Sequence, residues 1–331
     1  MRTARVLGNG ESYYHCMSRI IQGQMLINNK EKERFRKIMR LVSEFTGVEV
    51  LTYALMDNHL HLLLRVPNAD KIPENEVLRR IKVLYGRMHV EEVKKELKEL
   101  REHKDNAGVE LLLNSYTYRM HDLSQYMKML MQRFTQSYNK RHERRGHLWE
   151  GRFKSVLIEN KPGALSTMSA YIDLNAVRAG LVEDPKDYRF CGYGEAVAGN
   201  KDARKGMLIL YDILGYSDTW SKGNKYYRQH VFMQSNVHRK KGASISHEKI
   251  EEVLANGGKL SRTELLHCRV RYFSDGVVLG SQAFVEDIFN KYRDEFGLKR
   301  KSGARKPRCG DWGELCTMRD LKLSPVTLSS P

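Results

Sequence analysis

The sequence predicts an α+β fold, in which an antiparallel sheet carries helices on one face. Short segments with strand patterns alternate with longer amphipathic helices, in the order β-α-β-β-α-β-α. Apolar positions in the helical segments recur at the helical period, so each helix has one face to bury. The chain has 331 residues, of which 41% are hydrophobic, and this content is enough to form a packed core.

Six elements follow from hydrophobic periodicity and from the residues that flank each segment. They are a strand at 12–20, a helix at 29–45, a strand or hairpin at 47–66, a helix at 121–142, a strand at 147–158 and a helix at 163–180. The first helix has an apolar stripe that includes Phe35, Met39 and Val42. The last helix should end near Gly180, because glycine is common just past a helix end.

Composition divides the chain into three predicted regions. Residues 1–195 contain the six elements and should form one domain, with a highly charged helical insertion at about 70–119. Residues 196–245 are polar and contain several glycines, so we expect a linker region there. Residues 246–331 return to helical patterns and include a basic tail, which predicts a mainly helical accessory region.

Positive charge is the strongest signal in the composition. The formal net charge is +17, and lysine and arginine occur throughout the chain. This excess favours a polyanionic partner, most commonly nucleic acid, although charge alone would also suit a ribosome or an acidic membrane. No segment is long and apolar enough for a transmembrane helix, and the N-terminus lacks the apolar stretch of a signal peptide. We therefore expect a cytoplasmic protein without a membrane partner.

Two histidines interrupt the apolar run ALMDNHLHLLLRV in the predicted strand or hairpin. Because side chains alternate across a strand, His59 and His61 share one face and the leucines at 60, 62 and 64 share the other. The two histidine Cβ atoms should stand roughly 6–7 Å apart, close enough for both imidazoles to bind one cation. Two half-buried histidines held only by hydrogen bonds would give the same pattern, so the pair alone leaves both interpretations open.

The predicted helix at 163–180 offers side chains that complement the histidine pair. Tyr171, Asn175 and Arg178 lie at i, i+4 and i+7, beside the apolar stripe of that helix. A phenol can attack a phosphodiester when a metal or base assists it. Tyr171 is therefore the candidate nucleophile, Asn175 a candidate oxygen ligand of the cation, and Arg178 a candidate phosphate contact. A tyrosine that only packs at a helix boundary remains the alternative for Tyr171.

The segment QSYNKRHERRG contains a rival tyrosine and part of a basic cluster. Tyr138 lies on the apolar stripe of its predicted helix, which favours core packing over a catalytic role. We also expect Trp149 to lie in the core. The basic residues should contact nucleic-acid phosphates in a salt-dependent way. They are Arg133, Lys140, Arg141, Arg144, Arg145, Arg152 and Lys154.

Three motifs occur in the same order as in a known family of transposases. They are YALMDNHLHLLL, GHLWEGRFKS and AYIDLNAVRAG. On these motifs the chain resembles the single-tyrosine HUH transposases over about residues 10–195, and most closely their REP-associated tyrosine transposase branch. The resemblance implies that residues 1–195 form an HUH catalytic domain with a ferredoxin-like fold.

The resemblance assigns metal binding to His59, His61 and Asn175, and makes Tyr171 the nucleophile. It also implies that the substrate is single-stranded DNA, often with a hairpin. Two positions depart from the family pattern, since Asp57 stands where a proline is usual and an alanine follows Asn175 where a proline is usual. Neither change removes a ligand, and Asp57 shares the histidine face, where it could add negative charge near the cation.

These features predict a metal-dependent transposase that cleaves single-stranded DNA through a 5′-phosphotyrosine intermediate. Two imidazoles combined with amide and phosphate oxygens favour Mg²⁺ or Mn²⁺ over zinc. The protein would act as a monomer or a homodimer. Two alternatives remain: a relaxase or replication-initiator nuclease, and a non-enzymatic basic nucleic-acid-binding protein. A histidine triad or paired tyrosine would have favoured the relaxase alternative, and the sequence shows neither.

Overall fold

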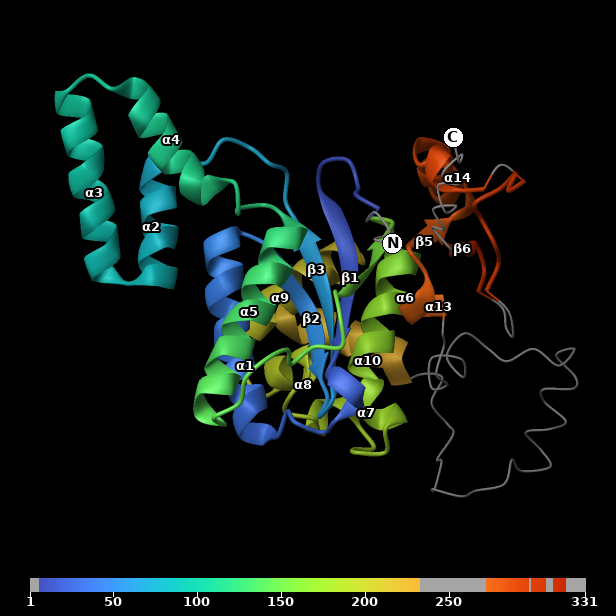
Figure 1. The fold of residues 1–331 in the computed structure, drawn as a ribbon. Coiled ribbons are helices and arrows are strands. Elements are labelled where there is room, and N and C mark those ends of the chain that lie inside the picture. The colour runs from blue at the N-terminus through green and yellow to red at the C-terminus, as the bar shows by residue number, and fades with distance from the viewer. Residues whose placement is uncertain (1–5, 233–271, 298, 308–311, 320–331) are drawn as a thin grey trace, which may run out of the picture.

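A six-stranded sheet with strand order β2-β3-β1-β4-β5-β6 forms the centre of the protein (Figure 1). The computed structural model describes residues 6–232, 272–297, 299–307 and 312–319. The strands are β1 (Ser12–Arg19), β2 (Glu49–Leu55), β3 (His59–Val66), β4 (Lys154–Ile158), β5 (Val278–Ser281) and β6 (Leu315–Met318).

The first four strands and two helices form a ferredoxin-like core. α1 (Asn29–Thr46) connects β1 to β2, and α5 (Leu123–Arg141) precedes β4. The β1–β3, β1–β4 and β2–β3 pairs are all antiparallel, which gives the order 4-1-3-2 of a split β-α-β-β-α-β unit. The predicted α+β fold is confirmed, and the segment predicted as a strand or hairpin at 47–66 is a hairpin.

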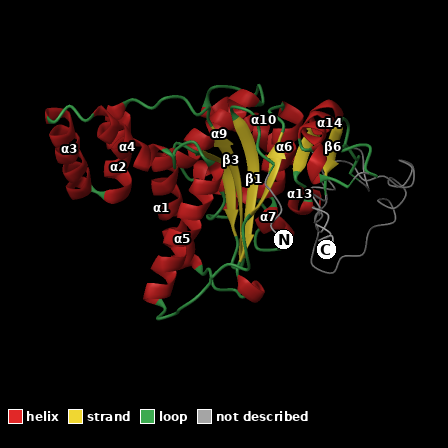
Figure 2. Cartoon of the chain, turned by 45° about the horizontal axis from the view of Figure 1, so that its top comes forward, coloured by secondary structure: helices red, strands yellow, loops and turns green. Residues whose placement is uncertain are grey.

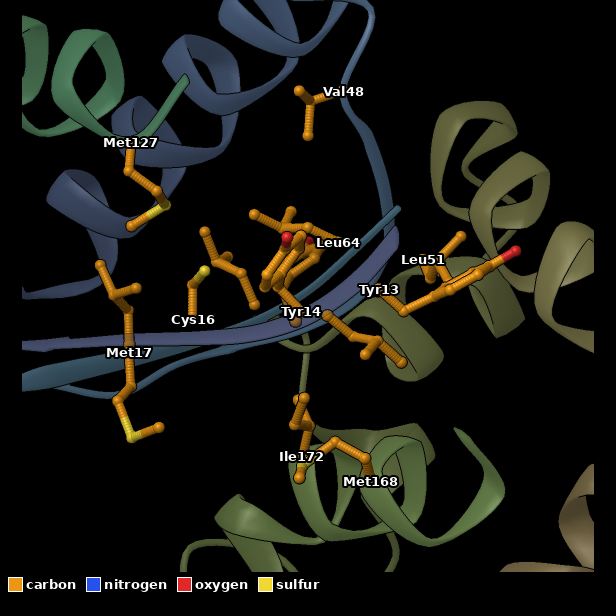
Figure 3. Packing of buried hydrophobic residues seen from close by; sticks show 14 of the residues in the cluster. Tyr13, Tyr14, Cys16, Met17, Val48, Leu51, Leu64, Met127, Met168 and Ile172 are labelled. Carbon is orange, nitrogen blue, oxygen red and sulfur yellow. The ribbon is translucent and has the colours of Figure 1, made fainter. Parts of the chain in front are cut away.

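Helices cover both faces of this sheet, whereas the sequence predicted helices on one face. α1 and α5 lie side by side over the face that carries Tyr14 and Cys16, as Figures 1 and 3 show. α6 (Pro162–Asp173) packs on the opposite face, where Met168 and Ile172 point toward the sheet (Figure 3). A second layer forms because every residue of α6 from Ala164 onward is buried, so this helix needs cover on several sides.

The described part of the predicted linker, residues 196–232, is helical and packed. The elements after α6 are α7 (Asn175–Arg178), a 3-10 turn (Pro185–Asp187), α8 (Gly192–Val197), α9 (Lys201–Ile213) and α10 (Trp220–Phe232). α9 covers the edge strand β2 so closely that a Cβ atom at Gly206 would lie 2.1 Å from the Val50 carbonyl oxygen. Met207, Leu210 and Tyr211 are buried on α9, and this stripe explains why a polar segment packs.

The described C-terminal segments extend the same sheet. α13 (Tyr272–Asp275) leads into β5, which runs parallel to β4, and β6 pairs antiparallel with β5. α14 (Gln282–Lys291) and a 3-10 turn (Arg293–Glu295) lie between the two strands in sequence. This region was expected to be mainly helical, so its two strands are an addition to the prediction. Residues 233–271, 308–311 and 320–331 lie outside the described part of the chain.

The insertion predicted at 70–119 is helical and stands away from the sheet in both views (Figures 1 and 2). It consists of α2 (Glu74–Tyr85), α3 (Arg87–Glu102) and α4 (Asn106–Thr117). The guanidinium of Arg119 anchors its base, lying 5.1 Å from the ring centroid of Phe45 on α1 and 5.4 Å from that of Tyr116 on α4. The arm therefore joins the core through a cation–π cluster at the end of α1.

Candidate active site

One face of the sheet carries three histidines. His59 and His61 lie on β3, and the register that pairs Met17 with His61 places His15 of β1 on the same face. The ring centroids of His59 and His61 are 5.2 Å apart, and those of His15 and His61 are 5.0 Å apart. The alternation predicted for β3 is confirmed, because Leu60, Leu62 and Leu64 are fully buried on the other face.

α6 brings Tyr171 to these histidines. The ring centroid of Tyr171 lies 6.0 Å from that of His61 and 6.0 Å from that of His15. The segment predicted as one helix breaks at Leu174, after which α7 begins at Asn175. The side chains of Asn175 and Arg178 both donate to the Tyr171 carbonyl oxygen, the former over 3.3 Å, and so satisfy this acceptor at the break.

The candidate nucleophile and its neighbours are nearly buried. The exposed fraction is 4% for Tyr171, 6% for His61 and 9% for Asn175. Phe273 of α13 lies edge-on to Tyr171, with ring centroids 5.0 Å apart. The Arg178 guanidinium lies 4.2 Å from the centroid of the same tyrosine ring. A DNA phosphate can therefore reach the phenol only if such covering side chains move.

A hydrogen bond from Asn58 orients the imidazole of His59. The Asn58 amide nitrogen donates to the Gly23 carbonyl oxygen over 3.1 Å. Its amide oxygen lies 2.6 Å from His59 Nδ1 and therefore accepts the Nδ1 hydrogen. A neutral His59 in this arrangement carries its lone pair on Nε2, the nitrogen that can bind a metal.

His15 orients His61 in the same way. Nδ1 of His15 lies 3.0 Å from the Phe273 carbonyl oxygen, which can only accept, so Nδ1 carries the hydrogen. A neutral His15 then accepts at Nε2 from the Nδ1 hydrogen of His61, over 2.8 Å. Burial lowers the pKa of His15 to about 4 and, with the neighbouring His15, His59 and Arg178, lowers the pKa of His61 well below its usual range. Both rings are therefore neutral at pH 7, and His61 presents the lone pair of Nε2.

The donor set fits a divalent cation. His59 and His61 can each offer Nε2, and the Asn175 amide uses its nitrogen on the Tyr171 carbonyl, which leaves its oxygen as the ligand atom. Within the residues that the structure describes, no three His, Cys, Asp or Glu side chains come together as a metal site. These residues would thus supply two imidazoles and an amide oxygen, with phosphate and water completing the coordination.

Asp57 does not add a net charge to this site, contrary to the expectation from its position in the sequence. Its carboxylate forms an ion pair with the Lys32 ammonium of α1 at 2.5 Å. The Lys32 side chain is only 4% exposed and also donates to the Tyr188 hydroxyl. The negative charge of Asp57 is therefore neutralised on the α1 side of the hairpin.

The predicted basic cluster divides into structural and exposed residues. Arg141 pairs with the buried Glu31, and the Arg133 guanidinium lies 5.4 Å from the ring centroid of Tyr85. Arg144 is half-buried and donates to the His147 carbonyl over 3.5 Å. The exposed members are Lys140, Arg145, Arg152 and Lys154. These four are the better candidates for phosphate contacts.

Tyr138 and Trp149 both lie in the core, as the sequence predicted. Tyr138 is 5% exposed, and its ring stacks on His142 with centroids 4.1 Å apart. The indole nitrogen of Trp149 donates to Thr135 over 3.0 Å, and its ring packs on Phe134. Neither side chain is placed to act on DNA in this conformation.

Two contributors to the site were not found from the sequence. His15 lies in SYYHCMSR, where strand alternation put it between two buried neighbours, and a histidine in that position was a signal without an assigned role. Phe273 lies more than 200 residues further along the chain, and no local pattern connects it to the histidines. Only the tertiary structure brings its carbonyl oxygen to His15.

The sequence of residues 10–107 matches the model of a family described as "Transposase IS200 like". This segment contains both histidines of β3 and ends before Tyr171. The predicted resemblance to these transposases is confirmed, and with it the class of protein, a DNA transposase. No curated protein matches the chain at a significant level.

One solved structure is similar to part of the chain. It is described as "Structure of the REP associates tyrosine transposase bound to a REP hairpin". The sequences are 14% identical, the similarity covers 60% of this chain and 87% of that chain, and the TM-score is 0.40. None of the helices in the described residues is long and apolar enough to cross a membrane.

Proposed function

We propose that this transposase is a metal-dependent endonuclease and strand transferase that cleaves single-stranded, hairpin-forming DNA. One observation carries the proposal: Tyr171 lies beside His61, although the two residues come from segments 110 positions apart. Asn175 and Arg178 converge on the same tyrosine through its carbonyl oxygen. A nucleophile, imidazole ligands, an amide oxygen and a cation thus meet at one place on the sheet.

In the proposed reaction, the Tyr171 phenol attacks a phosphodiester in the DNA. A bond forms between the phenolic oxygen and phosphorus, the bond to the 3′ oxygen breaks, and the phenol loses its proton while the leaving oxygen gains one. The product is a 5′-phosphotyrosine and a free 3′-hydroxyl, which a later attack can rejoin. Arg178, already beside the Tyr171 ring, is positioned to bind the phosphate when the DNA enters.

His59, His61 and Asn175 would hold the cation in this proposal. A bound divalent cation polarises the phosphate and orients it for attack. Mg²⁺ or Mn²⁺ suits the site, because both accept a small number of protein ligands together with phosphate and water oxygens. The exposed Lys140, Arg145, Arg152 and Lys154 would bind the DNA backbone. A cytoplasmic location remains the expectation from the sequence.

A covalent adduct between protein and DNA tests the proposal. The substrate is a pool of hairpin oligonucleotides with randomised single-stranded flanks, labelled at the 3′ end, which stays with the protein. With Mn²⁺ we expect a labelled band on a denaturing gel, and chelation should abolish it. Tyr171→Phe should lower adduct formation by about 10³-fold or more while leaving hairpin binding intact, because only the nucleophilic oxygen is removed.

Tyr138→Phe is the matched control, because that tyrosine packs in the core beside the same basic segment. It should retain the adduct. An adduct that persists in Tyr171→Phe would assign the nucleophile to another residue. Hairpin binding without any adduct in the unmodified protein would identify a DNA-binding protein that does not cleave.

A further inference from the structure

His15 is a buried polar residue to which the reaction above gives no part. Its side chain is completely buried, with an exposed fraction of 0%. Both of its ring nitrogens are in hydrogen bonds, one with the Phe273 carbonyl oxygen and one with His61. A histidine buried without a role would leave such a polar ring costly to keep, since apolar residues fill the rest of β1 from Tyr13 to Met17.

We propose that His15 is a positioning residue that fixes the tautomer and orientation of His61 for metal binding, with the Phe273 carbonyl as its anchor. The inference rests on the metal-dependent function proposed above. The chain of bonds has one direction, because a carbonyl oxygen cannot donate. It therefore places a hydrogen on Nδ1 of His15 and on Nδ1 of His61, and leaves Nε2 of His61 to face the cation.

The arrangement of the two metal-binding histidines supports this role. His59 has a neighbour on its own strand, Asn58, whose amide oxygen holds Nδ1. His61 has no such neighbour, because the residues on either side of it are leucines on the opposite face. The corresponding acceptor for His61 comes from the adjacent strand β1, as His15. Partners of this kind raise metal affinity by orienting the ligand, and their loss typically weakens binding about 10–100-fold.

The anchor also links a distant segment to the site. Phe273 belongs to α13, which precedes β5, and its ring packs on both Tyr171 and Trp312. The same residue thus covers the candidate nucleophile with its ring and orients a metal ligand with its carbonyl oxygen. We infer that the C-terminal segments around β5 complete the catalytic site of the domain formed by β1–β4.

The tautomer can be read directly in the unmodified protein. Two-bond ¹H–¹⁵N correlation spectra of the metal-free, histidine-labelled full chain should show His15 and His61 both as the Nδ1–H form at pH 7. Their signals are assigned by comparison with His15→Gln and His61→Gln. An Nε2–H form for either residue would overturn the proposal, whatever the protein does to DNA.

Metal affinity gives the second readout. Mn²⁺ binding to the full chain, followed by the loss of the free-ion electron paramagnetic resonance signal, should weaken about 10-fold or more in His15→Leu. His15→Gln should bind within about 3-fold of the unmodified protein, because its amide can donate to Phe273 and accept from His61. His121→Leu is a control in a partly buried histidine near the arm, and should leave Mn²⁺ affinity unchanged.

The outcomes separate this inference from the proposed function. Equal Mn²⁺ affinity in His15→Leu and the unmodified protein would overturn the positioning role even if Tyr171 forms its adduct. Weak binding in both His15→Leu and His15→Gln would also overturn it, because a side chain with the right donor and acceptor would then fail to substitute. If the unmodified protein bound no Mn²⁺, the proposed metal site would fail, and with it the purpose assigned to His15.

Discussion

The two faces of strands β1 and β3 differ in chemistry although they alternate residue by residue. On one face, Cys16, Leu62 and Leu64 are fully buried under α1 and α5, with no polar partner needed. On the other, His15 and His61 are just as buried, but under α6, and each ring nitrogen that the structure explains is hydrogen-bonded. The same backbone thus holds a fold-forming surface and a chemical surface about one side chain apart.

This comparison shows why the histidine face depends on distant parts of the chain. An apolar side chain is stabilised by any close-packed neighbour, with about 1.5–3 kcal/mol gained on full burial. A buried imidazole needs partners at particular positions, because an unsatisfied polar group costs roughly 1–3 kcal/mol. The leucine face is therefore specified locally, whereas the histidine face requires Phe273 and α6 to be in place.

The largest effect that we expect in this comparison comes from His59→Ala on the histidine face. Removing one proposed ligand should lower the rate of adduct formation by about 10³-fold, the upper end for losing one group that supports the developing charge. The unfolding temperature should change little, because His59 is only partly buried. Adduct gels and thermal denaturation measure the two quantities, and an unchanged cleavage rate would remove His59 from the site.

Leu62→Ala makes the reciprocal change, on the leucine face of the same strand. We expect a loss of about 3 kcal/mol in the free energy of unfolding, because a fully buried leucine leaves a cavity under α1 and α5. Adduct formation at 25 °C should stay within a few-fold, since the histidines keep their hydrogen bonds. Urea denaturation measures the loss, with Leu41→Ala on the exposed side of α1 as a control that should cost less than about 1 kcal/mol.

If Leu62→Ala instead abolished cleavage while the protein remained folded, the two faces would not be separable. The comparison would then fail at its central claim. A small loss of stability would show that the cavity closes by relaxation, and would leave the separation of the faces intact.

The sequence predicted the parts of the molecule that depend on local pattern. Strand alternation placed His59 and His61 on one face, and helical periodicity placed Tyr138 in the core, because each rests on a short repeat. The ferredoxin-like order of β1–β4 was implied by a resemblance and is found in the strand pairing. The meeting of Tyr171 with His61 was predicted by combining two patterns, and the structure places their rings 6.0 Å apart.

Features that depend on long-range packing could not be predicted in this way. Nothing near SYYHCMSR indicates that His15 would meet Phe273, and the polar composition of residues 196–232 concealed helices that pack on β2. Charge patterns were also ambiguous. Arg141 belongs by sequence to a basic cluster for DNA, but its neighbour in space is Glu31, which no spacing rule connects to it.

The smallest effect that we expect concerns that ion pair, which lies in the layer of α1 and α5. Glu31 is 3% exposed; burial opposes its ionisation, but hydrogen bonds from Arg141 and His142 outweigh burial and lower the pKa of its carboxyl. A carboxyl whose pKa is lower in the folded state stabilises the protein above its ordinary value of 4.5, and this contribution is lost as the pH falls. Glu31→Gln should therefore lower the free energy of unfolding by about 1–3 kcal/mol at pH 7, and by less below pH 4.5.

Urea denaturation at pH 7 and at pH 3.5 measures this dependence. Glu44→Gln is the matched control, because Glu44 pairs with Arg79 on α2 while its side chain is 46% exposed. It should change stability by less than about 1 kcal/mol at either pH. A loss in Glu31→Gln that stayed constant between the two pH values would mean that the carboxylate charge is not what stabilises α1 against α5. Arg141 would then be available to DNA like the exposed members of the basic cluster, and the α1–α5 layer would no longer be purely structural.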